Sequence, residues 1–165
     1  MANRYPVRWL LTDERLPDLW EALCRVPPGS GVIFRHHATP AAERLSMFRR
    51  VRRIARARGL LLIAANPPLP TAVHGRVRGA TSWPAHNRAQ AVAGWKAGAR
   101  LLLVSPVYPT RSHPGAKALG PMHAARMARG LGLPIIALGG MSERRWRRHH
   151  TLFDGWAGID AFSRD

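Results

Sequence analysis

Eight short apolar segments recur along the chain, and most of them are followed by a polar turn and then by a segment of helical character. The apolar segments are residues 8–11, 31–34, 60–65, 72–74, 80–82, 101–104, 134–138 and 156–159. Short apolar runs bounded by turn residues are typical of strands buried on both faces. Their alternation with helices predicts parallel βαβ units.

The helical segments that we expect between these strands are residues 18–24, 40–58, 87–98, 121–130 and 143–150. The clearest is 40–58, where Thr39 can cap the helix, Pro40 suits its first position and Gly59 follows its end. Its apolar stripe is predicted to consist of Leu45, Phe48, Val51, Ile54 and Ala55. The arginines of this segment, Arg44 included, are expected to lie off that stripe.

Eight strand–helix units predict a (β/α)8 barrel, although such barrels typically have about 250 residues and this chain has 165. We therefore expect a trimmed barrel, with the third, fourth and eighth helices short or missing. Prolines at 67, 68 and 70 already exclude a helix directly after the third strand. An open, doubly wound parallel sheet is the alternative fold. Residues 1–165 are expected to form a single domain.

The formal net charge is +17, and all but two of the 26 basic residues are arginine. Such a charge favours anionic partners: nucleic acid, an anionic membrane surface or phosphorylated small molecules. The arginines cluster on expected helix faces, where they are interpreted as solvated, and no RNA-binding signature surrounds the tryptophans. We expect no specific nucleic-acid partner.

The location of the protein is predicted from three features of the sequence. Cys24 is the single cysteine, which excludes an internal disulfide and fits a reducing compartment. No apolar run approaches the ~20 residues that cross a bilayer. The N-terminus has no apolar core of signal-peptide length. The sequence thus indicates a cytoplasmic protein without a membrane partner.

Residues 105–120 follow an expected strand and carry hydroxyl and cationic side chains between prolines and glycines. In a barrel of this kind the active site lies at the carboxyl ends of the strands. Thr110 and Ser112 can donate to phosphate oxygens, and Arg111 or Lys117 can supply positive charge. We therefore expect this segment to form one wall of an anion pocket. The alternative is a surface loop whose prolines merely end the strand.

A glycine pair, Gly139–Gly140, follows the next expected strand. Glycines allow the backbone to approach a phosphate closely, and phosphate sites often follow strands seven and eight of a barrel. The pair is expected to close the side of the pocket opposite residues 105–120. A plain tight turn is the alternative interpretation.

The segments LLTDERL, GVIFRH, LLIAAN, VHG, LLLVSPVYPTRSHPGAKALG, PIIALGGMS and FDGWAGIDAF occur in this order along the chain. Together they resemble the thiamine-phosphate synthase/thiazole tautomerase (TenI-type) superfamily. The resemblance implies a (β/α)8 barrel that joins an aminopyrimidine-methyl diphosphate to a hydroxyethylthiazole phosphate with loss of diphosphate. Those two phosphorylated compounds are the ligands it implies.

The resemblance also implies roles for individual residues. Arg35 matches the arginine that contacts the diphosphate, Asn66 the asparagine of the pyrimidine strand and Ser82 a serine beside the diphosphate. Thr110 and Ser112 match the threonines that bind thiazole phosphate, and Gly139–Gly140 matches the phosphate-binding glycines. Arg35, Asn66 and Ser82 are thus the candidate catalytic residues.

Several positions depart from the family pattern. The glutamine and lysine expected on either side of Arg35 are Ile33 and His37. The two aspartates that hold Mg²⁺ in the family are missing, because Pro67 replaces the first and residues 74–78 contain no carboxylate. Mg²⁺ is therefore a possible cofactor without its usual ligands, and we assign no metal-binding residue. Arg76, Arg78 and Arg111 are candidates to replace part of the metal's charge.

Further departures lie in the region that corresponds to the thiazole phosphate. His113 replaces a lysine, with Lys117 nearby, and Asp160 replaces a serine. These differences predict a synthase with weak or no Mg²⁺-dependent activity.

Three other functions stay open. A thiazole tautomerase is disfavoured because that branch has a histidine where Pro106 precedes Val107–Tyr108. A non-catalytic barrel that binds a phosphorylated ligand fits the missing carboxylates, and a basic nucleic-acid-binding protein fits the charge. The missing helices should uncover apolar barrel surface, so a homo-oligomer is expected.

Overall fold

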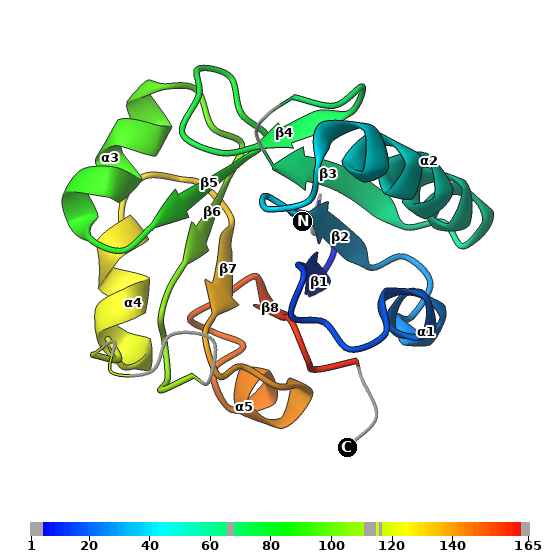
Figure 1. Cartoon of the computed structure of the whole chain (residues 1–165). Helices are drawn as coiled ribbons and strands as arrows, with labels where there is room; N and C mark the ends of the chain where they lie inside the picture. Colours follow the sequence, from blue (N-terminus) through cyan, green and yellow to red (C-terminus); the bar gives the residue numbers. More distant parts are fainter. Residues whose placement is uncertain (1–4, 66–67, 111–114, 116, 163–165) are drawn as a thin grey trace.

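The computed structural model describes residues 5–65, 68–110, 115 and 117–162. Its eight parallel strands form a closed barrel in chain order, with β8 returning to pair with β1 (Figure 1). The strands are β1 Arg8–Thr12, β2 Gly31–Phe34, β3 Leu61–Ala65, β4 Ala72–His74, β5 Ser82–Ala85, β6 Leu101–Val104, β7 Ile135–Leu138 and β8 Gly155–Gly158. The barrel prediction is confirmed, and the open doubly wound sheet is wrong.

Helices cover the barrel on its outside (Figure 1): α1 Leu19–Arg25, α2 Ala41–Ala57, α3 Arg88–Lys96, α4 Pro121–Ala128 and α5 Glu143–Arg148. Within the described ranges, no helix follows β3, β4 or β8, which confirms the trimmed barrel. Among the helices of the described chain, none is long and apolar enough to cross a membrane.

The inside of the barrel is filled by apolar side chains that alternate along the strands with outward-facing ones. This inner cluster comprises Trp9, Leu11, Ile33, Ile63, Leu101, Leu103, Ile136 and Ala157. The Trp9 ring packs over Gly31. A Cβ atom on Gly31 would lie 2.1 Å from Cε3 of the Trp9 ring. The chain thus uses a glycine in β2 to make room for the largest side chain of the barrel interior.

Two outer clusters pack the helices onto the barrel. Leu10 of β1 and Phe34 of β2 belong to the cluster formed with α1 and α2. Trp83 of β5 belongs to the cluster formed with α3 and α4, and its ring lies against Gly94 of α3. The outer core therefore consists of two separate clusters and is thin at β4, because no described helix follows β3 or β4.

The buried face of α2 differs from the predicted stripe. It consists of Arg44, Phe48, Val51 and Ala55, whereas Leu45 is only half-buried. The placement of Arg44 off the stripe is wrong, because its guanidinium finds backbone acceptors at the ends of two strands. Nε donates to the carbonyl oxygen of Arg35 (3.1 Å) and Nη2 to that of Ala65 (2.7 Å).

The start of α2 also differs from the prediction. Pro40 occupies the N-cap position without a side-chain hydrogen bond, and the helix begins at Ala41. Thr39 does not cap the helix, because its hydroxyl donates to Glu14 Oε1 at 3.1 Å. The Thr39 hydroxyl therefore bonds to Glu14, which is 25 positions away in the sequence, and not to the backbone of α2.

The fifth strand lies later than predicted, at Ser82–Ala85 rather than at 80–82. The strand contains Pro84, although proline cannot donate a hydrogen bond to a sheet. However, β4 pairs with β5 only at His74 and Ser82, and β5 continues alone against β6. The missing N–H donor of Pro84 therefore lowers the stability of the sheet only slightly at this position.

Candidate functional site

A pocket of about 680 Å³ lies at the carboxyl ends of the strands. Its walls come mainly from the segments after β6, β7 and β8: Ser105, Pro106, Pro109, Thr110, Lys117, Leu119, Leu138, Gly139, Gly140, Met141, Ser142, Arg145, Ala157, Gly158, Ile159 and Asp160. Arg35 after β2 and His86 after β5 complete the lining. This is the end of the barrel where enzymes of this fold bind their substrates.

The predicted site residues divide into three groups. Those that line the pocket are Arg35, Thr110, Lys117, Gly139 and Gly140. Asn66, Arg111 and Ser112 lie outside the described residues. Ser82 is described but does not line the pocket.

Ser82 is fully buried, and its hydroxyl oxygen lies 2.7 Å from His74 Nδ1. Burial, together with the positive charges of Arg35 and His37, lowers the pKa of His74 to about 4. His74 is therefore neutral at pH 7, and Ser82 is its hydrogen-bond partner across β4 and β5.

The segment after β6 is joined to the segment after β7 by backbone hydrogen bonds. Val107 N donates to Leu138 O (2.9 Å) and Tyr108 N donates to Gly139 O (3.0 Å). Gly139 and Gly140 have φ angles of 95° and 58°, in the left-handed region that favours glycine. The two loops thus form one wall, and both glycines belong to it. The expectation that the glycine pair closes the side opposite residues 105–120 is wrong, because these hydrogen bonds join the pair to that segment.

Arg145 is a pocket residue that sequence analysis missed. One of its guanidinium nitrogens, Nη1, donates to Gly140 O, and the guanidinium carbon lies 4.4 Å from the Tyr108 ring centroid. The arginines at 144–148 were all expected to face solvent, but the structure shows Arg145 half-buried and in the pocket while Arg144 is exposed. A basic residue in the helix that follows the glycine pair was the available signal.

His86 is a second pocket residue without an assigned role. Its Nδ1 lies 2.9 Å from the Ser105 backbone oxygen and 3.2 Å from the Ser105 hydroxyl oxygen. Its position directly after β5, at the carboxyl end of a strand, was the signal in the sequence.

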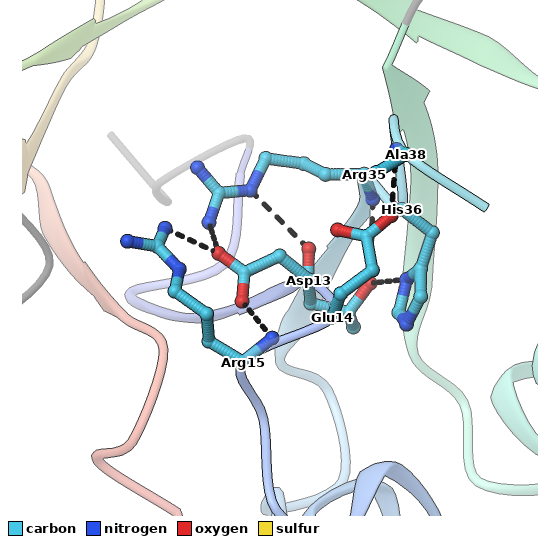
Figure 2. Close-up of polar contacts among 7 residues, drawn as sticks. Asp13, Glu14, Arg15, Arg35, His36 and Ala38 are labelled. Atoms are coloured by element: carbon cyan, nitrogen blue, oxygen red, sulfur yellow. Dashed lines mark hydrogen bonds and ion pairs between the residues drawn. The ribbon is translucent and has the colours of Figure 1, made fainter.

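Asp13, at the end of β1, connects two arginines next to the pocket (Figure 2). Its Oδ2 accepts from Arg35 Nη2 (2.5 Å) and from Arg15 Nη2 (2.7 Å), and its Oδ1 accepts from Arg15 N (2.9 Å). Burial raises the pKa of this carboxyl, but the hydrogen bond from Arg15 and the charge of Arg35 outweigh burial and lower it overall. Asp13 is therefore ionised at neutral pH.

The neighbouring Glu14 orders the loop after β2. Its Oε1 accepts from the backbone N–H groups of Ala38 (2.8 Å) and Thr39 (3.0 Å), as Figure 2 shows for Ala38. Within this loop His36 has a φ of 44° and stacks on Phe34 with the ring centroids 4.8 Å apart. The hydrogen bonds of Glu14 and the stacking of His36 on Phe34 thus hold the backbone next to Arg35 in one conformation.

The carboxylates of the described chain do not fit a Mg²⁺ site. Mg²⁺ prefers oxygen ligands in octahedral geometry. Asp13 binds two arginines, Glu14 binds the loop after β2, and among the described pocket residues Asp160 carries the only other carboxylate. No group of three or more His, Cys, Asp or Glu side chains in the described ranges is arranged to hold a metal ion.

Comparisons with known proteins agree on one family. The family model described as thiamine monophosphate synthase matches residues 78–162. A thiamine-phosphate synthase of Geobacillus kaustophilus is 45% identical over 60 residues, which span 35% of this chain and 27% of that protein. The matched part is thus about a quarter of the length of this relative.

The fold is also that of a solved protein, thiamine phosphate pyrophosphorylase from Pyrococcus furiosus. The two structures superpose with a TM-score of 0.74 at 17% identity, over 93% of this chain and 85% of the other. This similarity concerns the barrel architecture. Because the family model covers more than half of the sequence, the chain belongs to the thiamine monophosphate synthase (TenI-type) family.

Proposed function

We propose that this chain is a transferase of the thiamine-phosphate synthase type, which joins an aminopyrimidine-methyl diphosphate to a hydroxyethylthiazole phosphate. The observation that carries the proposal is the common pocket of Arg35, Thr110, Lys117 and the Gly139–Gly140 pair. These residues come from the segments after β2, β6 and β7. Arg35, Thr110 and the glycine pair match substrate-binding positions of the family, and Lys117 lies near the position of a family lysine.

The thiazole phosphate would bind against the wall that the segments after β6 and β7 form together. The Thr110 hydroxyl and the Lys117 ammonium are donors suited to phosphate oxygens, and charged hydrogen bonds to phosphate are among the strongest in proteins. Pro106 and Pro109 restrict the backbone on the Thr110 side, so less entropy is lost when the ligand binds.

In the proposed reaction the C–O bond between the pyrimidine methylene and the diphosphate breaks, and its electron pair leaves with the diphosphate. The thiazole nitrogen then donates its lone pair to the pyrimidine carbocation and forms the C–N bond. Arg35 would stabilise the charge that develops on the departing diphosphate, which is the main demand of such a step. Ser82 is given no direct contact with the substrate in this proposal, because it is buried, bonded to His74 and absent from the pocket lining.

Mg²⁺-dependent turnover is expected to be weak or absent, because no carboxylate stands at either family metal position. The measurement is thiamine phosphate formation by the purified chain, with and without Mg²⁺. Turnover similar to that of an ordinary synthase in the same assay would contradict this expectation.

The proposed pocket is tested by calorimetric titration with hydroxyethylthiazole phosphate. Thr110→Val should weaken binding by about 1–3 kcal/mol, the usual cost of leaving a buried polar partner unmatched. Thr151→Val, at an exposed position outside the pocket, is the control and should bind as the parent chain does. If the parent chain fails to bind this compound, the proposed function is wrong. If Thr110→Val folds and binds unchanged, the role of Thr110 is wrong.

A further inference from the structure

Two guanidinium groups meet at a single carboxylate beside the pocket. Arg15 and Arg35 both donate to Asp13 Oδ2, at 2.7 and 2.5 Å (Figure 2). Two positive charges and one negative charge leave this group of three residues with a net positive charge. Glu14, the nearest further carboxylate in sequence, accepts hydrogen bonds from the loop after β2.

Arg35 is held in a defined orientation toward the pocket. Its Nε donates to the Thr12 carbonyl oxygen (3.2 Å), its Nη2 donates to Asp13, and its side chain is 16% exposed. No acceptor for its Nη1 is found among the described residues, and the residue lines the pocket. The Nη1 donors are therefore available to a ligand that binds in the pocket.

Arg15 stands at the rim of the same cluster. Asp13 accepts from both its backbone N–H and its Nη2, while 53% of its side-chain surface is exposed. The shared carboxylate keeps the two guanidinium groups close together despite their mutual repulsion. A multiply charged phosphate group is the kind of anion that such a pair binds, because each guanidinium can donate two parallel hydrogen bonds.

We propose that Arg15 and Arg35, held side by side by Asp13, bind the diphosphate group of the substrate directly and without a divalent metal ion. This inference rests on the proposed function and deepens it. The family binds this group with Mg²⁺, but Asp13 and Glu14, the carboxylates beside Arg35, are occupied by arginines or by backbone N–H groups. Positive charge near the diphosphate thus comes from side chains rather than from a bound cation.

The probe is inorganic pyrophosphate, titrated into the full chain by calorimetry at constant ionic strength, once in EDTA and once in excess Mg²⁺. Binding should occur in EDTA, and Mg²⁺ should not tighten it. Arg15→Gln should weaken binding in EDTA by about tenfold, since it removes charged hydrogen bonds to the anion. Arg35→Lys should weaken it at least as much, because lysine lacks the planar fork.

The matched control is Arg25→Gln, which removes the same charge from the exposed end of α1 that leads into β2. It should leave pyrophosphate affinity unchanged within about twofold, because a distant surface charge is screened by salt. Pyrophosphate binding that requires Mg²⁺ would overturn the proposal. So would equal affinities of Arg15→Gln and Arg25→Gln.

A parallel titration with hydroxyethylthiazole phosphate separates this inference from the proposed function. If the thiazole phosphate binds but pyrophosphate does not bind in EDTA, the metal-free diphosphate site is wrong and the proposed function stands. If pyrophosphate binds in EDTA but thiazole phosphate does not, the proposed function is wrong and the anion site stands.

Discussion

Gly139 packs against Pro106 so closely that a Cβ on the glycine would lie 2.8 Å from the Pro106 Cα. The two residues belong to the segments after β7 and β6, which backbone hydrogen bonds also join. Gly140 is confined in the same way, because its Cβ would lie 2.6 Å from Pro109 O. The wall of the pocket therefore depends on the absence of side chains at both positions.

We predict that Gly139→Ala lowers the free energy of unfolding and weakens thiazole phosphate binding. The cost should be about 2–4 kcal/mol, from the left-handed backbone and from the displaced Pro106 backbone. Gly130→Ala is the matched control, since Gly130 also has a positive φ, of 76°, but nothing within 4 Å of its Cβ position. Denaturant unfolding and calorimetry measure the two effects. Equal losses for the two variants would contradict the steric argument.

Arg44 is predicted to stabilise the fold at the carboxyl ends of β2 and β3. Arg44→Met should lower the free energy of unfolding by about 2–4 kcal/mol, because the carbonyls of Arg35 and Ala65 lose charged donors in a buried place. Arg53→Met, on the exposed side of the same helix, should change it by less than about 0.5 kcal/mol. Similar urea midpoints for both variants would show that burial of Arg44 is not stabilising.

The protonation of His74 should lower the free energy of unfolding as the pH falls below 6.5. Its pKa is about 4 in the folded chain, against an ordinary value of 6.5, so between these values the unfolded chain binds a proton that the folded chain does not. This contribution is fully present above pH 6.5 and is lost as pH falls toward 4, up to about 3 kcal/mol.

Denaturant unfolding at pH 7 and pH 4.5 measures this loss. His74→Asn keeps a polar atom near the Nδ1 position but cannot titrate, so the variant should lose less stability on acidification than the parent chain. His150→Asn, at an exposed position, should follow the parent chain. The same acid loss in all three proteins would exclude His74 as its source.

Self-association is predicted at the barrel wall around β4, where the described chain has no covering helix. Val77, in the turn after β4, is 37% exposed, and Val73 of β4 is half-buried. Apolar surface of this kind is usually covered in solution. Sedimentation velocity should show a dimer or larger species at micromolar concentration, and Val77→Asp should shift it toward monomer. Met122→Asp, which changes an exposed residue on α4, should not. A parent chain that sediments purely as monomer would contradict the prediction.

The sequence by itself determined the barrel and the general position of the pocket. Apolar runs of strand length, alternating with helical segments, leave few ways to bury both faces of a parallel sheet. In a parallel barrel all carboxyl ends of the strands lie at one edge, so residues after separate strands meet there. Thr110, Lys117 and the Gly139–Gly140 pair could therefore be predicted as neighbours from their order along the chain, and they line one pocket.

Only the tertiary structure decided the partners of the arginines. Helical periodicity assigns Arg44 and Arg145 to solvent, because a charged side chain has no local reason to be buried. Arg44 donates to backbone oxygens of Arg35 and Ala65, and Arg145 lies over the Tyr108 ring. These partners come together only when strand ends and loops converge. The Asp13–Arg35 pair likewise joins residues 22 positions apart. Such contacts depend on which strands become neighbours in the closed barrel, and no local pattern of residue types contains that information.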